Sequence, residues 1–185
     1  MNVLLETWKT PFGLPPFAAI RDEDFGPAFD EALARARVAI SAIAEGAGTS
    51  FAEVIEALEL AEGDLDRVGG VFYNLAGADS TEAREALMRD LAPKMSAFSS
   101  EVTNNKALFA KIEALWQGRE GLGLTSEQAR VLELYRQMFV RSGAALEGEE
   151  AERLTAVKAR LAVLGTEFSQ NLLADERSWV MELPE

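Results

Sequence analysis

Residues 22–43 read DEDFGPAFDEALARARVAISAI, and this stretch decides the fold class. Its apolar residues recur at steps of three and four, the spacing that places side chains on one face of an α-helix. Gly46 and Gly48 follow, and glycine is a common residue just beyond the end of a helix. The pattern therefore predicts one long helix whose apolar face consists of Phe25, Phe29, Leu33, Ala36, Ile40 and Ile43.

Further helices follow with recognisable start signals. Ser50 with Glu53, and Thr125 with Gln128, have the spacing of a capping box, in which the two side chains each bind the other residue's backbone N–H. Asn104 or Asn105 is the expected cap of a short helix between these two. Gly143 is expected to end the helix that begins at Thr125.

Two of the predicted helices contain weak points. Gly63, Gly69 and Gly70 interrupt the helix that begins at Ser50, so we expect a kink or a close helix contact there. Pro93 lies inside a helix predicted from about residue 80 to residue 102, which it should bend or interrupt. The last helix repeats apolar residues from Leu154 to residue 172, and residues 180–183 are expected to form a short strand.

The whole pattern predicts an all-α protein, a helical bundle or array of about six helices. Residues 1–20 form an extended, proline-rich N-terminal arm, since Pro11, Pro15 and Pro16 disfavour helix there. The arm is rich in apolar residues, so we expect it to pack on the helices. Residues 21–185 are predicted to form the helical domain.

Composition narrows the possible partners. The chain carries 31 acidic and 18 basic residues, a formal net charge of −13. Nucleic acids and anionic membranes bind cationic surfaces, so we expect neither as a partner. The first residues lack the basic and apolar regions of a signal peptide, and no apolar stretch approaches the ~20 residues of a membrane span. The expected location is cytoplasmic.

The sequence contains no cysteine and no histidine. Thiol nucleophiles, thiolate or imidazole metal ligands and the commonest general base are therefore absent from this chain. Asp64 and Asp66 have the spacing of the first two calcium ligands of an EF-hand, but the closing glutamate is missing. The acidic cluster at 147–152 fits the first turn of a helix. We therefore predict no catalytic, cofactor-binding or metal-binding residue.

Several short segments occur in a specific order: TPFGLPPF at 10–17, FGPAF at 25–29, VFYNL at 71–75, NKALF at 105–109, FVRSGA at 139–144 and TEFSQNLLADE at 166–176. With Trp8, this ordered set resembles the N-terminal helical region of bacterial peptidyl-dipeptidases and oligopeptidase A. These enzymes are zinc metallopeptidases of the thimet oligopeptidase family. The resemblance extends over nearly the whole chain, and the arm is more similar to the peptidyl-dipeptidases.

The resemblance implies a role as the substrate-gating region of a larger peptidase that hydrolyses short oligopeptides, releasing dipeptides from their C-termini. In that family, zinc is bound by a downstream His-Glu-x-x-His helix and a later glutamate. The implied partners are therefore the catalytic domain of the same polypeptide and, for the whole enzyme, short peptides. Zinc is implied for the full-length parent only, and we expect this chain alone to be inactive.

A different class of function is also open. The alternative hypothesis is a stand-alone helical module without enzymatic activity, which binds a protein or peptide in a groove between its helices. A third option, a carboxylate-bridged metal protein, is disfavoured because no Glu-x-x-His pair occurs.

Overall fold

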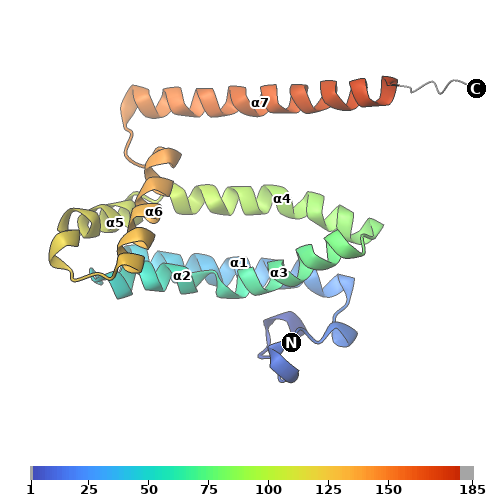
Figure 1. Cartoon of the computed structure of the whole chain (residues 1–185), viewed down its shortest axis with the longest axis horizontal. Coiled ribbons are helices and arrows are strands. Elements are labelled where there is room, and N and C mark those ends of the chain that lie inside the picture. The colour runs from blue at the N-terminus through green and yellow to red at the C-terminus, as the bar shows by residue number, and fades with distance from the viewer. Residues whose placement is uncertain (1, 180–185) are drawn as a thin grey trace, which may run out of the picture. The chain divides into compact units, whose positions relative to one another are not determined.

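The computed structural model describes residues 2–179, which contain helices and turns and no strand (Figure 1). The predicted all-α class is confirmed. The chain divides into two compact units, residues 1–144 and residues 145–185. The α-helices are α1 (Asp22–Glu45), α2 (Ala57–Ala61), α3 (Gly63–Ala78), α4 (Glu82–Thr103), α5 (Lys106–Gly118), α6 (Ser126–Ser142) and α7 (Gly148–Ser178).

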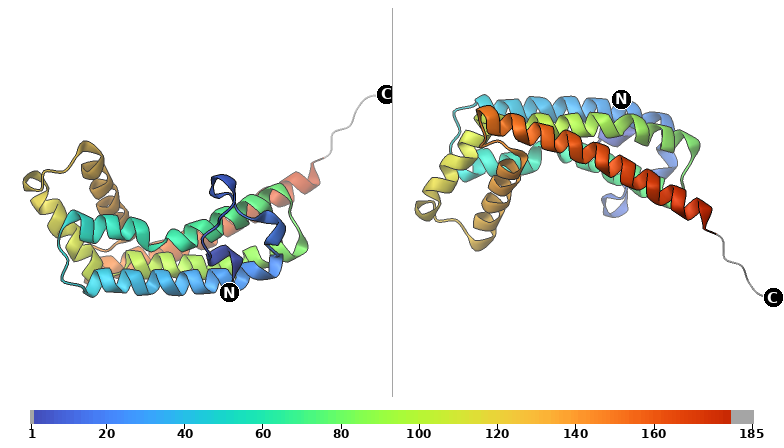
Figure 2. Two further views of the ribbon diagram at one scale, coloured as in Figure 1. Left: turned by 90° about the horizontal axis from the view of Figure 1, so that it is seen from below. Right: turned by 90° about the horizontal axis from the view of Figure 1, so that it is seen from above.

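Helix α1 is the centre of the first unit, with α3 and α4 running alongside it (Figures 1 and 2). Five of the six residues of its predicted apolar face are buried, and Ile43 is half-buried. Phe72 of α3 packs between Phe25 and Phe29, with ring centroids 5.1 and 5.5 Å apart. Burial of one such ring contributes roughly 1.5–3 kcal/mol, so this cluster is a large part of the core.

The predicted second helix is divided into three pieces. It begins with the expected capping box, in which the Ser50 hydroxyl accepts a hydrogen bond from Glu53 N at 3.2 Å and the Glu53 carboxylate accepts one from Ser50 N at 3.1 Å. A π-helical segment, Ala52–Glu56, then leads into α2. The break falls at Glu62, directly before Gly63, whereas the other two glycines named for a kink lie within continuous α3.

Pro93 was predicted to bend or interrupt its helix, and the structure shows no interruption. Helix α4 continues from Glu82 to Thr103, with Pro93 exposed on its surface. A proline in a helix interior removes one hydrogen bond and crowds the preceding turn, at a cost of about 3 kcal/mol, and α4 continues on both sides of Pro93 despite this cost.

Helices α5 and α6 form a packed pair joined by a short 3-10 turn, Arg119–Gly121. Phe109 stacks on Phe139 with ring centroids 6.1 Å apart. Asn105 is the cap of α5, accepting from Leu108 N at 3.0 Å, and the predicted capping box of Thr125 and Gln128 opens α6. Gly143 ends α6 in the left-handed conformation, with φ 96°.

The second unit contains one long helix, α7, whose N-terminal turn carries Glu149 and Glu150. The predicted strand at 180–183 lies outside the described residues. Within residues 2–179, no helix combines the length and the apolar character that crossing a membrane requires.

Candidate functional site

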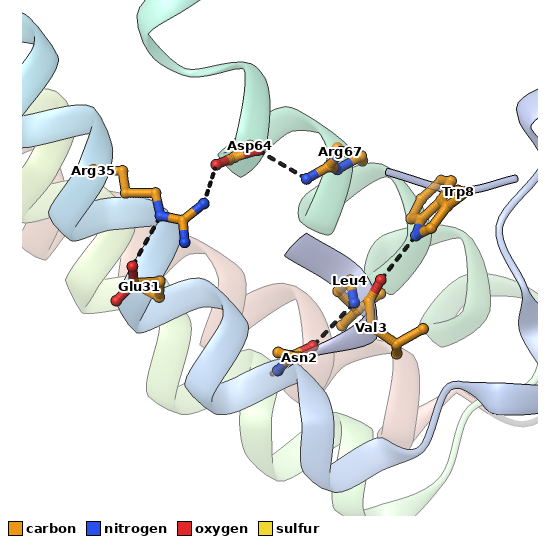
Figure 3. Close-up of polar contacts among 8 residues, drawn as sticks. All are labelled: Asn2, Val3, Leu4, Trp8, Glu31, Arg35, Asp64 and Arg67. Carbon is orange, nitrogen blue, oxygen red and sulfur yellow. Dashed lines mark hydrogen bonds and ion pairs between the residues drawn. The ribbon is translucent and has the colours of Figure 1, made fainter. Parts of the chain in front are cut away.

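The start of the chain is fastened to α1 by a short 3-10 turn, Val3–Leu5 (Figure 3). Asn2 donates its side-chain amide to the main-chain carbonyl of Asp24 at 2.7 Å, and its side-chain oxygen accepts from Leu4 N at 3.0 Å. Leu4 is completely buried in the core. Trp8 closes the turn by donating its indole N–H to the carbonyl of Val3 at 2.9 Å.

An ionic cluster lies beside this turn and joins α1 to α3 (Figure 3). The Asp64 carboxylate contacts Arg35 at 2.9 Å and Arg67 at 2.8 Å, and Arg35 also pairs with Glu31 at 2.8 Å. The Arg67 guanidinium lies over the ring of Trp8, 5.5 Å from its centroid. Asp64 therefore pairs with two arginines, one on α1 and one on α3.

The second half of the arm is exposed. Phe12 has a left-handed backbone, with φ 60°, and 99% of its side chain is accessible. A bulky residue rarely adopts this conformation, which costs on the order of 1–3 kcal/mol. Leu14 is 57% exposed and Phe17 is 50% exposed. The arm therefore packs on the helices through residues 3–8, and its segment 12–17 presents apolar side chains to solvent.

A groove opens between α2 and α3 on one side and α6 on the other, and Val102 near the end of α4 is also part of its lining. Its cavity volume is about 370 Å³, and its apolar lining consists of Leu58, Val102, Leu134, Met138 and Phe139. The polar residues of the groove are Glu59, Glu62, Asp66 and Tyr135. Sequence reasoning missed this site, because its two sides lie some seventy residues apart in the chain and no local pattern joins them.

The groove holds its carboxylates close together. Partial burial raises the pKa of Glu62, and the nearby charges of Asp66 and Glu59 raise it further. Burial likewise raises the pKa of Tyr135, and the nearby carboxylate of Glu59 raises it further. Within residues 2–179, no salt bridge involves Glu59, Glu62 or Asp66.

Acidic residues at the starts of α1 and α7 have structural roles. Asp24 caps the start of α1 by accepting from Arg21 N at 2.8 Å, and Asp22 pairs with Arg84 at 2.8 Å. Glu149 and Glu150 lie in the first turn of α7, where they complement the helix dipole. Among the described residues, no three Asp or Glu side chains are grouped as metal ligands.

One face of α7 is apolar and exposed. The side chain of Leu161 is 62% accessible and that of Phe168 is 69% accessible. Val157, Leu164 and Leu172 share the same spacing of three or four residues and are also exposed. An amphipathic helix of this kind is stabilised when its apolar face is covered by a partner.

The model of the family "Neurolysin/Thimet oligopeptidase, N-terminal domain" matches residues 29–151. The chain is 35% identical over 178 residues to a dipeptidyl carboxypeptidase of Salmonella typhimurium, covering 96% of this chain and 26% of that protein. The Escherichia coli dipeptidyl carboxypeptidase is 34% identical, with the same two coverages. Oligopeptidase A of Salmonella typhimurium is 31% identical over 92% of this chain and 25% of that protein. The chain thus spans about a quarter of these relatives.

Proposed function

This chain belongs to the neurolysin/thimet oligopeptidase N-terminal domain family, and on that premise we propose that it is the non-catalytic, substrate-gating region of a peptidase. The proposed parent hydrolyses short oligopeptides and releases dipeptides from their C-termini. Support comes from the identity with proteins named dipeptidyl carboxypeptidase, which extends over 96% of this chain. A cytoplasmic location is part of the same proposal.

The catalytic chemistry belongs to the rest of the proposed polypeptide. Zinc in peptidases is bound by imidazole and carboxylate ligands, and this chain has no histidine and no cysteine. Its residues therefore do not fit a zinc centre, and we assign none of them to the metal. The catalytic part, which would supply the metal and its ligands, is the proposed partner.

The observation that carries the proposal is exposed apolar surface within each of the two units. Phe168 and Leu161 of α7 are exposed in one unit, and Phe12 is exposed in the other. Burial of an apolar side chain contributes roughly 1.5–3 kcal/mol, so surfaces of this kind favour a partner. We propose that these residues pack against the catalytic part and help to shape the wall through which peptides enter.

A neutral solvatochromic dye tests this docking surface on the isolated chain. A neutral probe is preferable because the chain's charge of −13 repels anionic dyes. We expect the wild type to bind the dye, and the double variant Leu161→Glu, Phe168→Glu to lose most of this signal. The matched control Glu149→Gln, Glu150→Gln changes exposed residues of the same helix and should keep the signal. A wild-type chain that is folded and binds no dye would contradict the proposal.

A further inference from the structure

The groove between α2–α3 and α6 combines an apolar lining with a group of carboxylates. Its lining is apolar, with Leu134 and Met138 still partly open to solvent. Its volume of about 370 Å³ lies at the lower end of the 300–1,000 Å³ usual for ligand pockets. The groove therefore has room for a few side chains.

The carboxylates of the groove differ from two acidic residues on neighbouring helices, because they have no ion pair among the described residues. Glu113 and Glu101, on neighbouring helices, pair with Arg136 at 2.7 Å and Arg37 at 2.6 Å. In contrast, Glu59, Glu62 and Asp66 have no ion pair within the described part of the chain. Three adjacent carboxylates that repel one another are stabilised by any cation that binds between them.

We propose that this groove binds a peptide segment in which an Arg or Lys side chain is flanked by apolar side chains. The cationic group lies among Glu59, Glu62 and Asp66, where it replaces mutual repulsion by attraction. Flanking apolar side chains cover Leu134 and Met138. The long aliphatic part of an Arg or Lys side chain suits such a boundary, because it packs on apolar surface while its charge reaches the carboxylates.

The inference does not depend on the proposed peptidase parent. All the residues of the groove belong to the first unit, and binding is measured without any catalytic activity. The groove can therefore fail as a binding site while the family role stands, and the reverse also holds.

Methyl NMR of methionine tests the proposal on the full chain. Met138 lies in the groove, whereas Met88 and Met95 lie on α4 outside it and provide internal references. The probe is acetyl-Leu-Arg-Leu-amide, and the control peptide replaces arginine by citrulline, which has the same shape without the charge. We expect the arginine peptide to shift the Met138 methyl signal, assigned with Met138→Leu, and to leave the two reference signals in place.

A variant without the three charges sharpens the test. The substitutions Glu59→Gln, Glu62→Gln and Asp66→Asn preserve size and should weaken binding roughly tenfold, since the attraction between the carboxylates and the cation is lost. Unchanged Met88 and Met95 signals verify that this variant is folded. The control Glu120→Gln, Glu149→Gln, Glu150→Gln removes the same total charge at exposed positions elsewhere and should bind within about twofold of wild type.

Four results would overturn the proposal. The first is equal binding of the citrulline peptide, and the second is unchanged affinity in the triple variant of the groove. The third is a Met138 shift caused by calcium chloride alone, with no further change on adding peptide. The fourth is a Met138 shift that follows protein concentration, which would identify a second copy of the chain as the occupant.

Discussion

Asn2 donates its side-chain amide to the main-chain carbonyl of Asp24, 2.7 Å away, and so joins the beginning of the chain to the first turn of α1. The same side chain caps the turn at Leu4. We expect Asn2→Ala to lower the free energy of unfolding by about 1–2 kcal/mol, because a cap and a partly buried hydrogen bond are lost together. Urea unfolding measures this change.

The control for this substitution is Thr7→Ala. Thr7 is exposed, and its side chain makes no hydrogen bond among the described residues. Its replacement should change stability by less than about 0.5 kcal/mol. Equal losses in the two variants would mean that Asn2 does not fasten the arm.

Two apolar residues of the arm should differ sharply in their effect on stability. Leu4 is completely buried, so Leu4→Ala should cost about 2–5 kcal/mol through lost burial and the remaining cavity. Phe12 is 99% exposed, and Phe12→Ala should change the unfolding free energy by less than about 0.5 kcal/mol. Thermal and urea unfolding of both variants check this, and a similar loss in both would contradict the account of the arm.

Glu62 should reduce stability at neutral pH. Burial first, and then the charges of Asp66 and Glu59, raise its pKa in the folded chain above the ordinary value of 4.5. A carboxyl group whose pKa is higher in the folded chain than in the unfolded chain stabilises the fold at pH values below its unfolded pKa. This contribution is lost as the pH rises through the folded pKa. Glu62→Gln should therefore be more stable than wild type at pH 7, with the difference vanishing below about pH 4.5. Urea unfolding at several pH values tests this, and no gain at pH 7 would refute it.

Glu113 should show the opposite pH dependence. The hydrogen bond from Arg136 lowers its pKa below the ordinary value of 4.5. A carboxyl group whose pKa is lower in the folded chain than in the unfolded chain stabilises the fold at pH values above its unfolded pKa. This contribution is lost as the pH falls through the folded pKa. Glu113→Gln should be less stable than wild type at pH 7, and the difference should narrow below pH 4.5. The same unfolding series measures it; a gap that persists at pH 3 would show that the charge is not responsible.

Much of the fold could be predicted because its signals are local. Ser50 with Glu53 and Thr125 with Gln128 form their capping boxes within four residues, and Gly143 ends α6 where the end of the helix was expected. Each such motif is settled by contacts between near neighbours in the chain. The apolar repeat of α1 identified the buried face for the same reason.

Features that depend on distant contacts could not be predicted in the same way. The groove brings Glu59 and Glu62 beside Tyr135, and no spacing within either segment indicates that pairing. The break at Glu62 lies beside Gly63, where a kink was expected, but the π-helical segment before it was not predicted. Phe12 has an apolar side chain, and yet its exposure depends on where the chain turns after Trp8.

The most direct test of the central claim is the coding sequence downstream of codon 185 in the source genome. The account predicts that the reading frame continues into a segment that encodes His-Glu-x-x-His and a later glutamate, the ligands of a zinc peptidase. Such a frame would identify this chain as the N-terminal, non-catalytic quarter of the enzyme. A stop codon directly after Glu185 would contradict the claim, and the peptide-binding module would become the function to pursue.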